Sequence, residues 1–336
     1  MSAGGSQAAI IGAGSWGTAL ATVLSPRFQR VTLWAYEVDL VERMRFTRVN
    51  DVFLPGFSLP PNVEPTSDLG HALENADVVA GVMPSRFARA IYGEMLPHLK
   101  PEMRFVSATK GLEQGTLLRM SEVAREVIAE QFQPRIAVLS GPTFAREVAA
   151  GEPTAVVIAS EDGELAASIQ RDFSGPAFRL YASDDPAGVE IGAALKNIIA
   201  IGAGICEGLG LGSNTLAALI TRGLAEITRL AIALGGRPRT LSGLAGLGDL
   251  VLTCNGALSR NRSVGIELAK GRKLEEIVSS MKMIAEGVET TAAAVDLARK
   301  LQVDMPITEQ MGAILEGRIS PRQAIRELME RSLKAE

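Results

Sequence analysis

The chain has 336 residues, of which 47% are hydrophobic and 21% charged, and its formal net charge is −4 at pH 7. This apolar fraction excludes a largely disordered chain, and the length is sufficient for two domains with substantial cores. The interspersed charges argue against nucleic acid as a partner and against an anionic membrane surface, while leaving room for a local basic pocket that binds a small anion.

Residues 1–185 alternate strand-like and helix-like segments, which predicts an α/β domain with a mostly parallel sheet and crossover helices. Strands are expected at 8–11, 31–34, 77–83, 104–109, 135–140, 154–159 and 178–181. Prolines 55, 60, 61 and 65 predict a loop between the second and third of these strands. Ser67 or Asp68 is expected to cap the next helix, and Ser85 the helix that follows the third strand.

Strand signals end near residue 185, and small-residue helical patterns follow, so 186–336 is predicted to be an all-α second domain. Helices are expected at 187–207, 214–234, 264–269, 274–280, 290–301, 307–316 and 321–333. Gly235-Gly236 predicts a helix stop and Ser320-Pro321 a helix start. The apolar run from Ile191 is interrupted by Lys196, so no stable membrane insertion is expected.

The cysteines and histidines restrict the redox and metal chemistry. Cys206 and Cys254 lie outside any C-x-x-C pair in apolar or Gly-rich surroundings, which favours reduced, buried thiols of a cytoplasmic protein over a disulfide. Neither His71 nor His98 has a second metal ligand at helical spacing, so no metal site is expected. The first seven residues lack the basic and apolar regions of a signal peptide.

A glycine-rich turn near the chain start predicts a dinucleotide site. The first expected strand runs into Gly12-Ala13-Gly14-Ser15-Trp16-Gly17, a G-x-G-x-x-G pattern. Gly12 permits a tight turn, Gly14 lets the backbone approach a pyrophosphate, and Gly17 lets the next helix pack closely on the strand. Because the N–H groups of that helix start then face the phosphates, a dinucleotide is favoured over a purely structural turn.

The end of the second strand bears on which dinucleotide is bound. Tyr36-Glu37 follows Gly17 by about twenty residues, where a carboxylate accepts from the ribose 2′-OH of NAD and repels the 2′-phosphate of NADP. An ordinary solvated loop residue is an equally compatible interpretation of Glu37. NAD and NADP both remain candidates at this point.

Lys196 is the only ionisable residue in the run 191–201, and this isolation predicts a catalytic acid/base. A buried ammonium is costly unless it is paired or used, and burial favours proton exchange near neutral pH. The alternative, a lysine that extends from an apolar helix to the surface, accounts less well for the adjacent polar Asn197. Asp249 is the expected partner of Lys196, and Thr253, four residues later, shares its helix face.

Two further segments carry candidate anion-binding groups. Lys110 follows a strand end next to Gly111, where ligands of α/β sheets bind, although an ordinary loop lysine fits the position as well. Ser259-Arg260-Asn261 precedes a helix, with Ser259 or Asn261 as its cap. A helix start beside an arginine fits a phosphate, whereas a capped surface helix is the simpler interpretation of that segment taken alone.

These motifs, in this order, resemble those of bacterial NAD(P)-dependent glycerol-3-phosphate dehydrogenases along nearly the whole chain. The resemblance rests on several separate segments. They are 12–20, Leu54-Pro55-Gly56, Ala108-Thr109-Lys110-Gly111-Leu112-Glu113, Ser140-Gly141-Pro142-Thr143-Phe144-Ala145, Ala194-Leu195-Lys196-Asn197, Gly246-Leu247-Gly248-Asp249-Leu250 and Ser259-Arg260-Asn261.

The resemblance implies reversible reduction of dihydroxyacetone phosphate to sn-glycerol 3-phosphate by NAD(P)H, in support of glycerophospholipid synthesis. It implies a 6-phosphogluconate-dehydrogenase-like helical domain, a small phosphorylated substrate, a cytoplasmic location and a homodimer. Lys196 becomes the proton acceptor of the oxidative direction. The implied substrate contacts are Lys110, Gly141, Thr143, Lys196, Asp249, Thr253, Ser259, Arg260 and Asn261. The implied dinucleotide contacts, beyond the three glycines, are Ser15, Trp16, Tyr36, Lys110, Ala145, Arg260, Ile284 and Glu286.

The chain departs from the family pattern at one position, and two other classes of protein share part of its motifs. Members of the family often carry a basic residue where this chain has Tyr36, so NAD use is more plausible here than membership alone implies. A ketopantoate-reductase-like or 3-hydroxyacid-dehydrogenase-like enzyme is one alternative, but it would lack the Ser-Arg-Asn phosphate site. A non-catalytic dinucleotide sensor is the other, and it would need the glycine turn without Lys196, Asp249 and Arg260.

Overall fold

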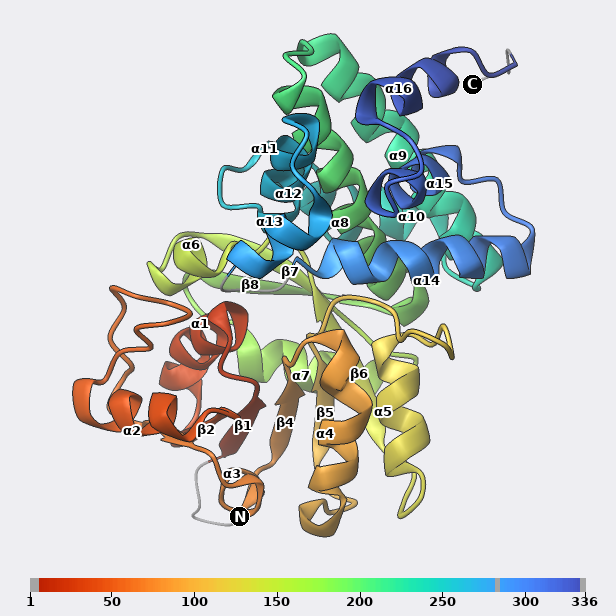
Figure 1. Cartoon of the computed structure of the whole chain (residues 1–336). Helices are drawn as coiled ribbons and strands as arrows, with labels where there is room; N and C mark the ends of the chain where they lie inside the picture. The colour runs from red at the N-terminus through yellow and green to blue at the C-terminus, as the bar shows by residue number, and fades with distance from the viewer. Residues whose placement is uncertain (1–5, 282–284, 333–336) are drawn as a thin grey trace. The chain divides into compact units, whose positions relative to one another are not determined.

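The computed structural model describes residues 6–281 and 285–332, which divide into two compact units (Figure 1). The first unit contains the described residues of Met1–Lys110 and Arg119–Val189, and the second those of Gly111–Leu118 and Glu190–Glu336. The chain therefore leaves the first unit briefly after Lys110, returns at Arg119, and leaves again within its longest helix.

The first unit is built on one sheet of eight strands in the order β3-β2-β1-β4-β5-β6-β7-β8. All neighbouring strands are parallel except β6 and β7, which confirms the predicted mostly parallel α/β sheet. The strands are β1 (Gln7–Ile11), β2 (Arg30–Trp34), β3 (Val63–Thr66), β4 (Val78–Gly81), β5 (Arg104–Ser107), β6 (Arg135–Ser140), β7 (Thr154–Ala159) and β8 (Phe178–Ser183). The helices are α1 (Ser15–Leu24), α2 (Val38–Thr47), α3 (Leu69–Leu73), α4 (Ala88–Met95), α5 (Met120–Ile128), α6 (Ala145–Ala149) and α7 (Gly163–Phe173).

The middle of the sheet is covered on both faces. Ala8, Ala9, Ile10 and Ile11 of β1 point alternately to opposite faces, yet none is more than 1% exposed. This burial explains why β1 is uniformly apolar rather than alternating. Among the covering helices, α4 packs beside α5 (Figure 1).

The expected loop between the second and third predicted strands is partly wrong, because it contains the edge strand β3. Pro65 lies within β3, paired with Leu33 of β2. Proline has no N–H to donate, and an edge strand tolerates it because its outer side needs no partner. The expected cap at Ser85 is also wrong: Phe87 N donates to Pro84 O (3.0 Å), so Ser85 lies inside a short 3-10 turn before α4.

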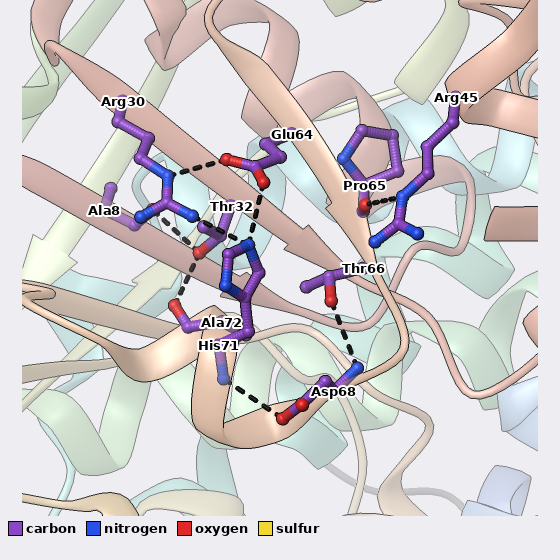
Figure 2. Close-up of polar contacts among 10 residues, drawn as sticks. All are labelled: Ala8, Arg30, Thr32, Arg45, Glu64, Pro65, Thr66, Asp68, His71 and Ala72. Carbon is purple, nitrogen blue, oxygen red and sulfur yellow. Dashed lines mark hydrogen bonds and ion pairs between the residues drawn. The ribbon is translucent and has the colours of Figure 1, made fainter. Parts of the chain in front are cut away.

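Asp68 caps α3 as predicted, accepting from His71 N at 3.1 Å, and the same helix anchors the edge strand (Figure 2). The carboxylate of Glu64, on β3, accepts a hydrogen bond from Arg30 Nε of β2 (2.8 Å) and another from His71 Nε2 of α3 (2.7 Å). The His71 hydrogen bond, together with Arg30, lowers the pKa of the Glu64 carboxyl below its usual value. These contacts hold α3 and β3 to the sheet, away from the carboxyl ends of the strands.

The second unit is helical, as predicted. Its elements are α8 (Pro186–Gly208), which begins in the first unit, α9 (Ser213–Ala233), α10 (Pro238–Leu241), the π-turn η4 (Leu244–Gly248), α11 (Asp249–Asn255), α12 (Arg260–Ala269), α13 (Leu274–Ser280), α14 (Glu286–Leu301), α15 (Pro306–Leu315) and α16 (Pro321–Met329). By length and composition α8 is long and apolar enough to cross a membrane, but its whole apolar window is buried inside the protein. It is therefore the core helix of this unit.

Small residues let α8 and α12 cross at very short range. A Cβ at Gly204 of α8 would lie 1.9 Å from Arg262 O, and one at Gly265 of α12 would lie 2.0 Å from Ile201 O. Neither contact is possible for a larger residue without moving a backbone. The small-residue patterns therefore place the start of α12 against α8.

Glu226 is a buried carboxyl that joins α9 to the start of α15. It accepts from Ile307 N (2.6 Å), Thr308 N (3.1 Å) and Thr308 Oγ1 (3.1 Å), and so caps a helix whose own N-cap, Met305, has no capping side chain. Burial raises the pKa of Glu226 to about 7, against the opposing effect of these donors and of Arg229.

Replacing Glu226 with glutamine is expected to remove a decline in stability between pH 4.5 and about pH 7. A carboxyl whose pKa is raised on folding holds its proton more tightly in the folded state. Its contribution to the free energy of unfolding is therefore full at acidic pH and is lost as pH rises through the folded pKa. The loss is on the order of 3 kcal/mol. Urea unfolding midpoints across this pH range test it, and parallel profiles for wild type and Glu226→Gln would contradict it.

Candidate active site

The predicted partnership of Lys196 and Asp249 is present in the second unit. Lys196 Nζ lies 2.9 Å from Asp249 Oδ1 and donates to Thr253 Oγ1 at 2.7 Å, and the two charged side chains are 7% and 1% exposed. Thr253 in turn donates to Asp249 O (2.6 Å), one helical turn earlier on α11. The amine is therefore held by a carboxylate and a hydroxyl inside the protein, and it does not extend into solvent.

Close backbone contacts of the segment before α11, with α8 on one side and with the end of α10 on the other, set this geometry. A Cβ at Gly192, one turn before Lys196, would lie 2.7 Å from Ala245 O, and one at Gly246 would lie 2.1 Å from Leu241 O. Both Ala245 and Gly246 belong to the π-turn η4, which ends directly before Asp249. Single π-turns are frequent at functional sites, and here the turn delivers the carboxylate to the lysine.

The cysteine thiols of this unit remain protonated and are not suited to acid/base chemistry. Burial raises the pKa of the Cys254 thiol to about 12, so the residue beside Thr253 stays a neutral thiol. Cys206 and Cys254 are both free and buried, which confirms the expected reduced thiols. Lys196 is therefore the group in this cluster suited to exchange a proton.

The Ser259-Arg260-Asn261 segment forms the start of α12. Ser259 is the N-cap, and its hydroxyl accepts from Arg262 N at 3.3 Å, as the sequence predicts. Arg260 is exposed, while Asn261 is only 7% exposed. Asn261 does not cap its own helix. Its Oδ1 instead accepts from Gly287 N (3.0 Å) at the start of α14, a role that the sequence did not indicate.

The glycine turn of the first unit joins β1 to α1 where the strand order reverses between β1 and β4. Ligands of open α/β sheets bind at this switch point. Gly12 has φ +119°, and a Cβ there would lie 2.9 Å from the backbone of Val82 and Met83. A Cβ at Gly17 would lie 1.9 Å from Gly12 O. Both positions therefore require glycine for reasons of the fold.

The remaining features of this turn fit a bound dinucleotide. A Cβ at Gly14 would meet nothing within 4 Å, so this glycine leaves open space beside the helix start. The ten-residue α1 has no capping side chain and no acidic residue in its first turn, which favours an anion there. Trp16 Nε1 is buried without a hydrogen-bond partner among the described residues, a donor that a ligand can satisfy.

Asn50, which the sequence analysis missed, braces this turn. It is fully buried, and its Nδ2 donates to Ala13 O (2.8 Å) and Thr18 Oγ1 (2.9 Å), while Oδ1 accepts from Phe53 N (2.9 Å). The Ser15 hydroxyl donates to Phe53 O (2.7 Å) from the other side. The loop that carries Leu54-Pro55-Gly56 is thereby tied to the glycine turn.

We expect Asn50→Ala to weaken NADH binding about tenfold, because two hydrogen bonds of roughly 1 kcal/mol each hold the turn in shape. Asn62→Ala is a matched control: Asn62 Nδ2 also donates to two backbone carbonyls, Ser25 O and Phe28 O, but at the opposite end of the strands. Both variants should lose thermal stability, and only the first should lose affinity in a fluorescence titration. Equal affinities would show that Asn50 supports the fold alone.

The other predicted residues are distributed between the two units. Tyr36 follows β2 and is 79% exposed. Lys110 follows β5 and donates from Nζ to Gly141 O (3.4 Å), and Thr143 Oγ1 donates to the same carbonyl (3.2 Å). Ala145 begins α6, and Glu286 begins α14. Ile284 lies outside the described residues.

Comparison with known proteins identifies the family. The family model described as "NAD-dependent glycerol-3-phosphate dehydrogenase N-terminus" matches residues 7–166, and the corresponding C-terminus model matches residues 185–326. The chain is 58% identical over 328 residues to glycerol-3-phosphate dehydrogenase [NAD(P)+] of Koribacter versatilis, covering 97% of each chain. It is 56% identical over 327 residues to the protein of that name from Syntrophotalea carbinolica, covering 97% of this chain and 98% of that protein.

A solved structure agrees with these matches. The crystal structure of glycerol-3-phosphate dehydrogenase from Coxiella burnetii superimposes with a TM-score of 0.92 at 43% identity, covering 97% of this chain and 99% of that one. The resemblance inferred from the motifs is confirmed, and the two alternative classes are set aside. With both family models matched in order and relatives of this identity along nearly the whole chain, the protein belongs to the NAD-dependent glycerol-3-phosphate dehydrogenase family.

Proposed function

We propose that this protein catalyses the reversible reduction of dihydroxyacetone phosphate to sn-glycerol 3-phosphate with NAD(P)H. The observation that carries the proposal is the buried Lys196–Asp249–Thr253 cluster, in a chain whose other unit has a glycine turn suited to a dinucleotide. Within this scheme residues 1–185 bind the dinucleotide, and residues 186–336 bind the substrate and supply the acid/base.

The nicotinamide, when bound, supplies the hydride that reduces the ketone carbon. Negative charge then develops on the carbonyl oxygen, and Lys196 donates a proton to it. In the oxidative direction Lys196 accepts that proton. Asp249 and Thr253 orient the amine, which is supported by their distances of 2.9 Å and 2.7 Å from Nζ. Lys110 is proposed to add a second positive charge near the substrate.

The phosphate group of the substrate is proposed to bind at the start of α12. Arg260 supplies a fork of donors there, Asn261 supplies an amide, and Ser259 shapes the turn through its cap. Gly141 and Thr143, after β6, are proposed to lie near both ligands. Holding the phosphate away from the reacting carbon orients the ketone for attack.

The dinucleotide is proposed to bind along Gly12, Gly14, Gly17, Ser15 and Trp16. Ala145, Arg260, Ile284 and Glu286 are further proposed contacts. An exposed Tyr36 followed by Glu37 favours NAD, because neither side chain offers the positive charge that a 2′-phosphate requires. The proposed setting is the cytoplasm, with a homodimer as the active form and glycerophospholipid synthesis as the consumer of the product.

The direct test follows the absorbance of reduced nicotinamide in purified protein. Dihydroxyacetone phosphate should drive oxidation of NADH, and NADPH should be compared in parallel. Non-phosphorylated keto acids, including ketopantoate, serve as controls. Oxidation with those keto acids but not with dihydroxyacetone phosphate would refute the proposed substrate.

Replacing Arg260 with alanine is expected to raise the KM for dihydroxyacetone phosphate by about 10- to 100-fold, because a charge-assisted hydrogen bond to a phosphate contributes about 1.5–3 kcal/mol. Arg272→Ala is a suitable control, since Arg272 is an exposed arginine of the same unit that pairs with Glu267 (3.0 Å). Steady-state kinetics at saturating NADH measure both. An unchanged KM in Arg260→Ala would remove this residue from the phosphate site.

A further inference from the structure

The first turns of α12 and α14 are joined by one side chain. Asn261, the second residue of α12, accepts a hydrogen bond through Oδ1 from the backbone N–H of Gly287, the second residue of α14. The N-cap of α14 is Ala285, which has no side-chain group to offer. Asn261 therefore supplies from a neighbouring helix the cap that α14 lacks.

Gly287 allows α14 to begin directly beside the catalytic lysine's helix. A Cβ at this position would lie 2.7 Å from Asn261 Oδ1 and 2.8 Å from the backbone oxygen of Asn197. Asn197 is the residue after Lys196. The starts of α12 and α14 thus meet at one point on α8, and Glu286 is one residue away from that contact.

The two ends of the Asn261 carboxamide serve different purposes. Oδ1 is occupied by Gly287 N, while Nδ2 makes no hydrogen bond to any part of the chain that the structure describes. The nitrogen is thus available for an anion beside Arg260, whereas the oxygen holds the segment that carries Glu286. A ligand that orients the nitrogen also orients the oxygen, because the amide is planar.

We propose that Asn261 is a positioning residue for the start of α14 and that it couples binding of the phosphorylated substrate to binding of the dinucleotide. The inference rests on the proposed function, in which Arg260 and Asn261 hold the phosphate and Glu286 contacts the dinucleotide. Coupling of this kind is reciprocal, so each ligand tightens the other by the same factor.

The test measures NADH affinity by fluorescence titration, with and without sn-glycerol 3-phosphate, a combination in which no turnover occurs. Wild type should bind NADH about fivefold more tightly when glycerol 3-phosphate is present. Asn261→Ala loses both ends of the amide. It should bind NADH alone about three- to tenfold more weakly than wild type and show no effect of glycerol 3-phosphate.

Asn261→Asp separates the two tasks. Its carboxylate still accepts from Gly287 N, so NADH affinity should stay within about twofold of wild type, while KM for dihydroxyacetone phosphate rises at least about tenfold through repulsion. NADH affinity in Asn261→Ala equal to that of wild type would overturn the inference. So would an equal loss of NADH affinity in the alanine and aspartate variants.

Gly287→Ala provides a second route if Asn261→Ala does not fold. Its added methyl group meets Asn261 Oδ1 and Asn197 O, so it should displace the start of α14 and weaken NADH binding while Arg260 is unchanged. Unchanged NADH affinity in Gly287→Ala would also overturn the inference. A wild-type protein that binds NADH but does not turn over dihydroxyacetone phosphate would instead refute the proposed function.

Discussion

Replacing Lys196 with alanine is expected to lower turnover of dihydroxyacetone phosphate by about 10²–10⁴-fold, the typical contribution of general acid–base catalysis. NADH affinity should stay within about twofold of wild type, since the change leaves the glycine turn of the other unit intact. Rapid-mixing kinetics measure the first effect, and fluorescence titration the second. Lys270→Ala is the control, because Lys270 is an exposed lysine of the same unit, paired with Glu267 at 2.8 Å.

Lys196→Ala also leaves Asp249 buried without its counter-charge, so a loss of activity has to be separated from a loss of folding. The double variant Lys196→Met, Asp249→Asn removes both charges together and keeps a similar volume. It should be more stable than Lys196→Ala yet equally inactive. Near wild-type turnover in either folded variant would show that Lys196 does not transfer the proton.

Replacing Asp249 with asparagine is expected to destabilise the second unit by about 3–5 kcal/mol, because the buried Lys196 ammonium loses the carboxylate that lies 2.9 Å from it. A fall in kcat of about 10²-fold should accompany it, because the amine loses the carboxylate that orients it at 2.9 Å. Denaturant unfolding and steady-state kinetics measure the two effects on the same preparation.

Glu267→Gln is the matched change at an exposed ion pair. Glu267 pairs with Lys270 and Arg272, whose hydrogen bonds lower the pKa of its carboxyl, but the cluster is solvated. Exposed pairs contribute little to stability, so this variant should unfold close to wild type. If Asp249→Asn unfolded at the same midpoint as Glu267→Gln, the buried pair would contribute no more to stability than the exposed one.

The sequence predicted correctly those features that depend on the residues of a single short segment. β6 and β7 have the predicted bounds because each is a short apolar run between turn residues. The partnership of Lys196 with Asp249 was predictable because each is an isolated charge in an apolar segment. A buried charge is costly unless an opposite charge lies beside it. The reduced cysteines followed from the same kind of argument.

Sequence reasoning failed where a residue's partner is set by topology. β3 was missed because Pro65 is a strand breaker in general and is tolerated only at a sheet edge, and no local signal marks a strand as the edge. Asn50 went unnoticed because an asparagine in a loop is ordinary until its amide is found against the glycine turn.

The chain by itself determined the fold class, the glycine turn and the buried charges, because hydrophobic period, turn chemistry and the cost of an isolated charge all act locally. Only the tertiary structure decided which groups Asn50, Asn261 and Glu226 bind through hydrogen bonds. Their partners lie 37, 26 and 81 residues away, and a single polar group paired across such distances leaves no period in the sequence.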